Sequence, residues 1–380
     1  MLGVPTLAEL IDSLDGWYPP ATAESWDAVG LSCGDSSAEV HRVLLAVDCL
    51  PATVAEAIDV GAGLLLTHHP LLLSGVHSVA ADTPKGALLH RMIRAGVAHF
   101  VAHTNADVAA GGVSEALAER LALLDCRPLL ADPRPPLDQL TVYVPVPDTD
   151  RLIDALAAAG AGEVGNYTEC AYVVSGTGQF RPQPGADPAE GQIGVLHRGP
   201  ENRVSMVLPR GRRRAVLAAM RAAHPYEEVA FELTEQPALP AGTGTGRVGR
   251  LPTPMTLAEF TDYVAQRLPR TSWGVRAAGR PDQLVETVAV CGGSGASYLP
   301  DARRAGADAY LSSDFKHHVS SEAVAEAAGV LPELALVDAA HWATEAPWLH
   351  LVAGRLRERF DTLQVLVSEL VTDPWTLHAR

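Results

Sequence analysis

The chain has 380 residues, of which 47% are hydrophobic, and a formal net charge of −16 at pH 7. This length predicts two domains, or one domain with a large insertion, and the acidic charge argues against broad nucleic-acid binding because phosphates would be repelled. No apolar stretch approaches the roughly 20 residues of a membrane-spanning helix and the N-terminus lacks a secretory signal, so we expect a cytoplasmic protein with no membrane association.

The first third of the chain alternates short apolar runs with helical segments. We expect strands at residues 43–47, 64–66 and 97–102, and helices at 52–60, 85–95 and 115–124, the last with Ser114 as its cap. Strand–helix–strand units of this length predict an α/β domain with a mainly parallel sheet covered on both faces.

The middle third has a different pattern. A proline-rich stretch at 127–137 indicates a domain boundary, and the glycine-rich stretch at 241–246 indicates a flexible linker back. Between them we expect a βαββαβ order typical of a ferredoxin-like α+β domain, with strands at 140–146, 170–175, 204–208 and 229–233 and helices at 148–159 and 213–223.

The last third resumes the α/β rhythm, with predicted strands at 284–290, 309–311 and 334–337 and helices at 300–306 and 321–328. We therefore expect residues 1–132 and 247–380 to form one α/β domain that is interrupted by an inserted domain at residues 133–246.

Two adjacent histidines, His68 and His69, end the apolar run that begins at Leu64. The carboxyl ends of strands are where α/β sheets place functional groups, and buried histidine needs a polar partner or a metal. One packed histidine beside one surface histidine would also explain the pair, and the pair alone leaves these two interpretations evenly balanced.

The segment from His103 to Asp107 follows the next predicted strand. Asp107 is a plausible metal ligand because a carboxylate can bridge two cations, and His103 could be a ligand or could orient one. Turn formation by Asn105 and Asp107 is the alternative explanation, and it is strong for this segment taken alone.

A third group follows the strand that ends at Asp338. The spacing of His341 and Glu345 would suit one helical face, but Pro347 favours a helix that begins at Glu345, with Thr344 as its cap and His341 in the preceding loop. Asp338 could orient a ligand histidine. Glu345 could instead serve only the helix dipole.

Together, these clusters suit Zn²⁺, Mn²⁺ or Fe²⁺, and two metals bridged by carboxylates would fit the set. The five cysteines are scattered and form no CxxC pair, which argues against a cysteine zinc site.

Two other motifs are less specific. The loop Gly292-Gly293-Ser294-Gly295 could cradle a phosphate, although a tight turn explains it equally well. For His224-Pro225-Tyr226-Glu227-Glu228, which ends a predicted helix, we favour a structural or interface role over a catalytic one.

The ordered motifs resemble the Nif-three-like dinuclear metal-centre family, whose members are called GTP cyclohydrolase 1 type 2 homologues. The resemblance rests on residues 67–70, 103–107, 292–295 and 341–345, and on Trp26-Asp27-Ala28-Val29-Gly30-Leu31, where Ala28 replaces the usual asparagine. It covers essentially the whole chain. The motif at 224–228 matches longer members that carry an inserted domain similar to PII-type and CutA-type trimeric proteins.

This resemblance implies a set of five ligands for two divalent metal ions per subunit: His68, His69, Asp107, His341 and Glu345. It also implies a toroidal homohexamer with its metal sites facing a central cavity. The function we expect is metal-dependent hydrolysis of a nucleotide-like substrate, with no catalytic acid or base identified. The alternative is a non-enzymatic metal-handling, regulatory or scaffold protein.

Overall fold

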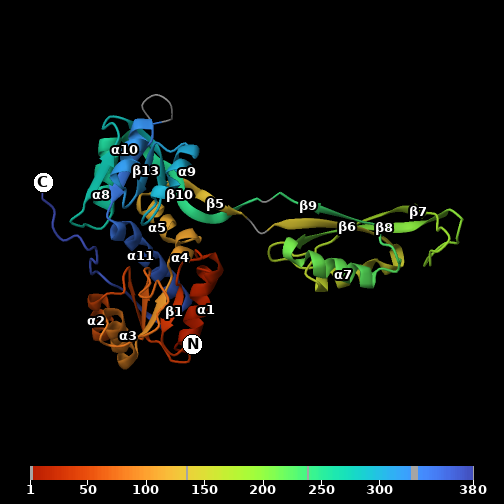
Figure 1. Ribbon diagram of the computed structural model, residues 1–380, viewed down its shortest axis with the longest axis horizontal. Helices are drawn as coiled ribbons and strands as arrows, with labels where there is room; N and C mark the ends of the chain where they lie inside the picture. The colour runs from red at the N-terminus through yellow and green to blue at the C-terminus, as the bar shows by residue number, and fades with distance from the viewer. Residues whose placement is uncertain (1–2, 134–135, 238, 327–332, 380) are drawn as a thin grey trace. The chain divides into compact units, whose positions relative to one another are not determined.

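The structure is a computed structural model that describes residues 3–133, 136–237, 239–326 and 333–379. The chain divides into two compact units (Figure 1). The larger unit comprises Met1–Asp132 and Gly242–Arg380, and the smaller unit comprises Pro133–Ala241. In the described residues, no helix is both long and apolar enough to cross a membrane.

The larger unit contains two sheets, and both are mixed. The first has the order β1-β4-β3-β2-β15, in which only the β1–β4 pair is antiparallel. The second has the order β11-β14-β13-β12-β10-β5, in which β11 and β10 run antiparallel to their neighbours β14 and β12. The expectation of one mainly parallel sheet is therefore wrong, because β1, β10 and β11, which lie outside the strand–helix–strand units, add antiparallel pairs.

The first sheet and its helices are built largely from the N-terminal part of the chain. Its strands are β1 (Gly30–Cys33), β2 (Arg42–Ala46), β3 (Leu64–Thr67), β4 (Ala98–Val101) and β15 (Gln364–Val367). The helices of this part are α1 (Leu7–Trp17), α2 (Pro51–Asp59), α3 (Pro84–Ala95), α4 (Thr104–Val108) and α5 (Val113–Arg120).

The second sheet combines two long strands with strands from the last third. They are β5 (Leu124–Pro133), β10 (Pro240–Thr256), β11 (Val275–Ala278), β12 (Leu284–Val290), β13 (Ala309–Ser312) and β14 (Ala335–Ala339). The helices are α8 (Leu257–Arg267), α9 (Leu299–Arg304), α10 (His317–Glu326) and α11 (His341–Arg359). The predicted helix at 321–328 overlaps α10, but its last two positions lie outside the described residues.

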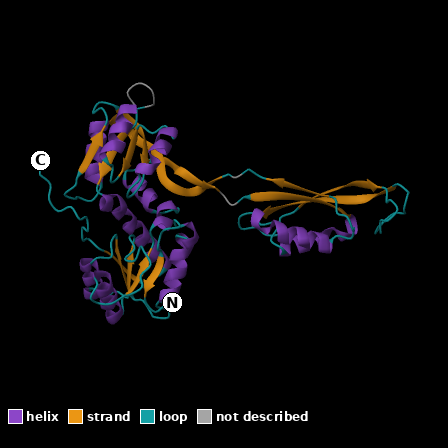
Figure 2. Cartoon of the chain, viewed as in Figure 1, coloured by secondary structure: helices purple, strands orange, loops and turns teal. Residues whose placement is uncertain are grey.

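Alternation along the first sheet separates two apolar layers, because successive strand residues face opposite sides. Leu45 and Leu66 join the main core, whereas their neighbours Leu44 and Leu65 pack with residues of α2 and α3. The main core also contains residues of β12, β13, β14 and α11, and so it joins the two sheets. Figure 2 shows the helices that lie beside the two sheets of the larger unit.

The two chain segments that lead to and from the smaller unit are strands. β5 includes most of the proline-rich stretch, and β10 includes the glycine-rich stretch that the sequence predicted to be a flexible linker. That prediction is wrong for a steric reason. A Cβ atom at Gly244 would lie 2.2 Å from the carbonyl oxygen of Leu130 on β5. The glycine therefore permits a close approach of two strands rather than flexibility.

The smaller unit runs in the order β6 (Leu137–Pro145), α6 (Thr149–Ala158), β7 (Tyr172–Phe180), β8 (His197–Pro209), α7 (Arg213–Ala223) and β9 (Phe231–Glu235). Its sheet has the order β7-β8-β6-β9, and every neighbouring pair is antiparallel. Both helices lie against one face of this sheet (Figure 2). Their buried residues pack with inward residues of β6 and β8 in one core.

Candidate metal centre

The two adjacent histidines follow β3, whose four residues are all buried. The backbone continues the strand pairing past its end, because the amide of His68 donates to Ala46 (3.3 Å) and that of His69 to Val47 (2.8 Å). The ring centroids lie 5.1 Å apart at an angle of 42°, and His68 is only 1% exposed. Both rings therefore face one place, and His69 is 26% exposed there rather than free on the surface, so the interpretation of one packed and one surface histidine is wrong.

His341 and Glu345 lie on the first turns of one helix. α11 begins at His341, with Ala340 as its N-cap, and Pro347 lies inside it. The prediction of a helix that begins at Glu345 is therefore wrong: the helix accommodates proline at the position where the Ala343 carbonyl would otherwise receive an amide. The four-residue spacing brings His341 Nε2 to 2.9 Å from Glu345 Oε1.

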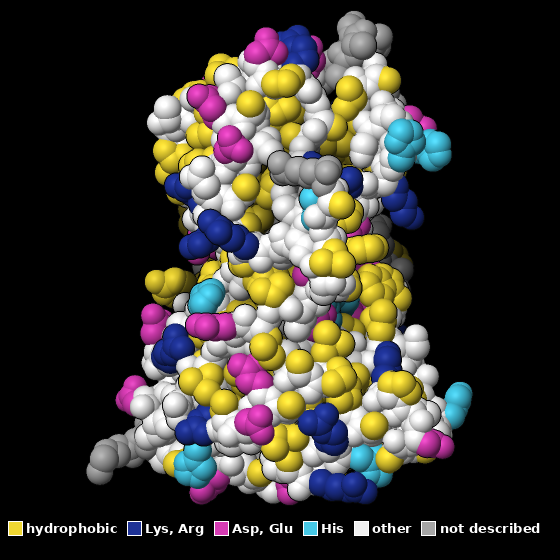
Figure 3. All heavy atoms as spheres, turned by 90° about the vertical axis from the view of Figure 1, so that its left-hand side faces the viewer, with side chains coloured by type: hydrophobic (Ala, Val, Ile, Leu, Met, Phe, Trp, Pro, Cys, Tyr) yellow, Lys and Arg dark blue, Asp and Glu magenta, His cyan; other side chains and the backbone are white. Residues whose placement is uncertain are grey.

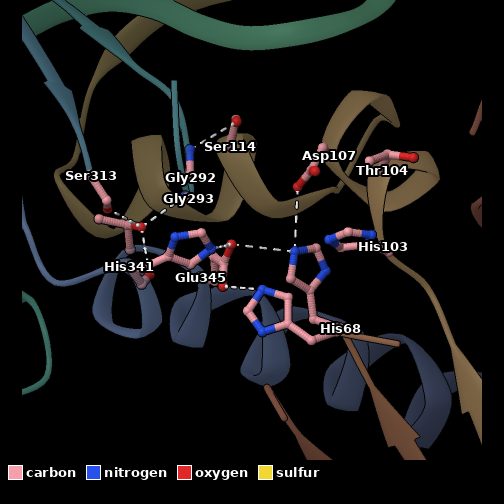
Figure 4. A network of polar contacts seen from close by, with 12 residues as sticks. His68, His103, Thr104, Asp107, Ser114, Gly292, Gly293, Ser313, His341 and Glu345 are labelled. Atoms are coloured by element: carbon pink, nitrogen blue, oxygen red, sulfur yellow. Dashed lines mark hydrogen bonds and ion pairs between the residues drawn. The ribbon is translucent and has the colours of Figure 1, made fainter. Parts of the chain in front are cut away.

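Glu345 lies at the centre of the cluster and is only 3% exposed. Its Oε2 is 3.1 Å from His69 Nε2, and its Oε1 is 3.5 Å from His68 Nε2. One carboxylate thus contacts three imidazoles from two distant chain segments. Figure 4 shows Glu345 between His341 and His68.

The short helix α4 adds two more residues. Asp107 lies on this helix with Oδ1 3.6 Å from His68 Nε2 (Figure 4). His103 is the N-cap residue of the helix, and its ring lies 5.1 Å from that of His68 and 5.5 Å from that of His69. The structure therefore gathers all five predicted ligands, and His103, into one place.

Each histidine ring of the cluster has an oxygen acceptor at Nδ1. The acceptor of His68 is the Ala102 carbonyl at 2.9 Å. The other acceptors are the carboxylates of Asp48 for His69 (2.7 Å), Asp27 for His103 (2.8 Å) and Asp314 for His341 (2.7 Å). These bonds keep the proton on Nδ1, so Nε2 is the nitrogen that presents a lone pair to a metal.

Sequence reasoning missed these three carboxylates. It proposed Asp338 as the orienting group, but Asp338 forms an ion pair with Arg276 at 2.6 Å and lies in no described contact with a ligand histidine. The sequence contains a pattern that could have identified two of them. Asp48 and Asp314 each lie two residues after the end of a strand, as His69 does. Asp27 belongs to the motif at 26–31 and also accepts a bond from the Thr104 amide at 3.0 Å.

The glycine loop at 292–295 lies against the cluster. Gly293 has φ +65°, and a Cβ atom there would lie 2.5 Å from Glu345 Oε1, so only glycine fits. Hydroxyl oxygens of Ser114, Thr344 and Ser312 accept the amides of Gly292, Gly293 and Gly295, and Ser294 is exposed. These three amides are therefore not free to cradle a phosphate. Ser114 lies within α5, whose cap is Gly112 rather than Ser114.

The charges in this cluster are mutually dependent. Burial disfavours the ionised form of Glu345, but His69 and His341 hold its pKa well below its ordinary value. Burial likewise opposes charge on the histidines, but Glu345 and the orienting carboxylates raise the pKa of His69 to about 10 and that of His341 to about 11. Burial raises the pKa of Asp107 to about 6.

These pKa shifts predict proton release when a metal binds. His69 and His341 are protonated near neutral pH in the metal-free protein, and both must be neutral to ligate. Metal affinity should therefore increase as pH rises, and it should fall further below about pH 6 as Asp107 takes up a proton. Titration calorimetry in two buffers of different ionisation enthalpy would measure the released protons. Identical heats in both buffers, with an affinity independent of pH, would contradict this prediction.

The donor set fits a metal on a separate ground. In the described residues, His68 Nε2 and Asp107 Oδ1 are buried and have no hydrogen-bond partner. Such atoms are costly unless something else satisfies them. Two groups have ligand atoms that all lie within 4.8 Å of one another: one is His68, His69 and His103, and the other is His69, His341 and Glu345.

The fold and this cluster define a class: an α/β protein with a buried histidine–carboxylate centre able to hold a metal ion. Residues 5–374 match the family described as Duf34/NIF3 (NGG1p interacting factor 3). The chain belongs to this family, and the resemblance noted in the sequence is confirmed.

Similar proteins extend over nearly the whole chain. A Mycobacterium tuberculosis protein called "GTP cyclohydrolase 1 type 2 homolog" is 48% identical over 377 residues, covering 98% of this chain and 97% of that protein. A Bacillus subtilis protein of the same name is 36% identical over 372 residues, covering 97% of each chain. The crystal structure of a Bacillus cereus protein related to NIF3 superposes with a TM-score of 0.73 at 34% identity, covering 99% of this chain and 100% of that chain.

Proposed function

We propose that this protein binds two divalent metal ions per chain and is a metal-dependent hydrolase that acts on a nucleotide-like substrate. The observation that carries the proposal is the pair of three-residue groups that share His69, since two overlapping groups suit two neighbouring ions. His68, His69, Asp107, His341 and Glu345 are the proposed ligands, and His103, which belongs to the first group, is a further candidate.

The chain's own residues would prepare this centre. Asp48, Asp27 and Asp314 fix the orientation of His69, His103 and His341, while Glu345 supplies the buried negative charge. Two divalent ions, when bound, would lower the pKa of a bound water and polarise a substrate oxygen. Zn²⁺, Mn²⁺ and Fe²⁺ all suit nitrogen and carboxylate ligands.

A cavity of about 360 Å³ beside the cluster supports a planar substrate. Its lining includes His69 and His341 together with Trp273, Trp342 and Trp375. The rings of Trp273 and Trp375 lie 5.9 Å apart. In the described residues, Trp273 Nε1 and Asp373 Oδ2, which belong to residues of this lining, have no hydrogen-bond partner. A heterocycle with both a donor and an acceptor suits these walls, and the names of the relatives favour a nucleotide.

The proposal predicts two metal ions per chain and turnover that depends on them. Protein purified without chelators and reconstituted with Mn²⁺, Zn²⁺ or Fe²⁺ should contain close to two ions per chain by elemental analysis. It should then be assayed on GTP, other nucleotides and small phosphoesters. Activity should disappear with chelator, return with metal and be lost in His68→Ala and His341→Ala.

The outcomes separate the two candidate functions. Negligible content of all these metals would overturn the metal-centre proposal. Two bound ions without turnover of any substrate would favour a metal-handling, regulatory or scaffold role instead. Turnover that survives chelation and both histidine substitutions would assign the chemistry to another site.

We also propose that the protein forms a homohexamer in the cytoplasm and does not bind nucleic acid. Tyr172, Val173 and Val174 on the edge strand β7 are exposed apolar side chains that a second copy could cover. All five cysteines are free, as expected in a reducing compartment. The face of the larger unit in Figure 3 intersperses acidic and basic side chains. Light scattering would give the mass, and a monomer at micromolar concentration would contradict the hexamer.

A further inference from the structure

The smaller unit contains a cavity of its own, of about 280 Å³. Three aromatic rings belong to its lining: Tyr143 on β6, Phe180 at the end of β7, and Tyr226 after α7. The rings of Phe180 and Tyr226 meet edge to face, with centroids 5.5 Å apart at an angle of 66°. A concave site of this size and composition suits a small organic molecule.

The motif at 224–228 builds one wall of this cavity. His224 is buried, and it donates from Nε2 to the Tyr143 carbonyl (2.9 Å) while its Nδ1 accepts the Tyr226 amide (3.1 Å). Both ring nitrogens are therefore used, and burial lowers the pKa of His224, which keeps it neutral. This histidine fixes the turn and thereby the position of the Tyr226 ring.

Tyr226 in turn holds a carboxylate. Its hydroxyl donates to Glu201 Oε1 at 2.9 Å. The other oxygen of Glu201 lies over Gly178 on β7, where a Cβ atom would lie only 1.9 Å from Oε2. The carboxylate position thus depends both on a positioned tyrosine and on the absence of a side chain at residue 178.

The described lining of the cavity is acidic, and two basic side chains lie behind it: the His197 ring lies 5.1 Å from that of Phe180, and Arg198 donates to Gln179 Oε1 at 2.9 Å. Glu201, Glu227 and Glu228 all belong to its lining, and the described lining residues include no lysine, arginine or histidine. Within the described part of the chain, Glu201 takes part in no ion pair of 4.0 Å or less, whereas nearby Glu190 pairs with His197. Glu227 accepts the Asp187 amide (2.8 Å), which ties the loop before β8 to the same wall.

We propose that this cavity binds a small organic cation, with an ammonium group beside Glu201 and a flat apolar body against Phe180 and Tyr226. A cation gains both from a partly buried carboxylate and from the negative faces of aromatic rings. An anion would meet three carboxylates, and a neutral molecule would gain only the apolar contact. This site is separate from the metal cluster and goes beyond the proposed hydrolase function.

Three probes that share one phenyl ring would test this proposal. Titration calorimetry on the full-length protein would compare 2-phenylethylamine, 2-phenylethanol and phenylacetate, which are cationic, neutral and anionic. The amine should bind roughly tenfold or more tightly than either of the others. Binding should be the same in chelator-treated and metal-loaded protein, which excludes ligation of the amine to a metal.

Two variants and one control assign the binding to this cavity. Glu201→Gln keeps the size but removes the charge, so it should weaken the amine roughly tenfold and abolish the preference over the alcohol. Phe180→Ala should weaken the amine and the alcohol alike. Glu163→Gln, at an exposed position of the same unit, should change nothing. Equal affinity for all three probes, no binding of the amine, or an unchanged amine affinity in a folded Glu201→Gln protein would each overturn the proposal.

Discussion

Glu345→Gln is expected to abolish tight metal binding while the protein remains folded. The substitution keeps the size of a side chain that is 3% exposed, but it removes a carboxylate that lies within 3.5 Å of three histidine Nε2 atoms. A neutral amide is a poor ligand for these cations. Of its two terminal atoms, only the carbonyl oxygen can coordinate a metal, because the NH₂ group is a hydrogen-bond donor. We expect an affinity loss of at least roughly 100-fold, since outer-sphere changes alone cost 10–100-fold.

Competition with a chromophoric chelator would measure this loss for each metal. The matched control is Glu358→Gln, the same change at an exposed position of the same helix, α11, which should leave the affinity unchanged. Circular dichroism would show that both variants are folded. Wild-type metal content and affinity in Glu345→Gln would mean that this residue is not a ligand, and the shared centre would then be wrong.

Asp314→Asn and Asp48→Asn are expected to weaken metal binding roughly 10–100-fold each. Neither residue belongs to the two groups of ligand atoms, but each carboxylate accepts the Nδ1 proton of one ligand histidine at 2.7 Å. An asparagine can offer its NH₂ group to Nδ1, which favours the wrong tautomer and moves the proton to Nε2. The pKa of His341 in the metal-free protein should also fall, because Asp314 contributes to raising it.

The informative control for this pair is Asp338→Asn. The sequence suggested that Asp338 could orient a ligand histidine, whereas the structure pairs it with Arg276. Competition titrations should therefore show a loss in Asp314→Asn and little change in folded Asp338→Asn. NMR of the histidine side chains would report the tautomer and pKa directly, which a merely structural effect would not alter. If Asp338→Asn weakens the metal more than Asp314→Asn, the assignment of the orienting carboxylate is reversed.

Local patterns in the sequence predicted much of the secondary structure. The apolar run at 64–66 became β3, and Gly96 ends α3 in a left-handed conformation, as its position after a helical pattern suggested. The candidate ligand residues were proposed for a similar reason. Polar side chains that directly follow apolar strands are costly unless they have a role, and His68, His69 and Asp107 all occur in such segments.

Longer-range features could not be predicted in this way. The start of α11 was predicted four residues too late, because a proline at position 347 locally disfavours a helix that begins at His341. The packing of ten buried residues of α11 nevertheless stabilises that helix. The glycine-rich stretch at 241–246 was taken for a linker, because the sequence cannot show that Leu130 lies against Gly244. The division of one expected sheet into two depended on pairings between strands far apart in the chain.

The sequence by itself determined the types of candidate ligand, their places near strand ends and the membership of a family, since these depend on residue identity and local order. Only the tertiary structure decided which carboxylate contacts which histidine. Asp48, Asp314 and Asp338 all lie at or just after the ends of strands, yet two of them bond to the Nδ1 atoms of candidate ligand histidines and the third pairs with an arginine. That choice depends on the register and packing of separate strands, which bring side chains within hydrogen-bond distance, and no local pattern contains that information.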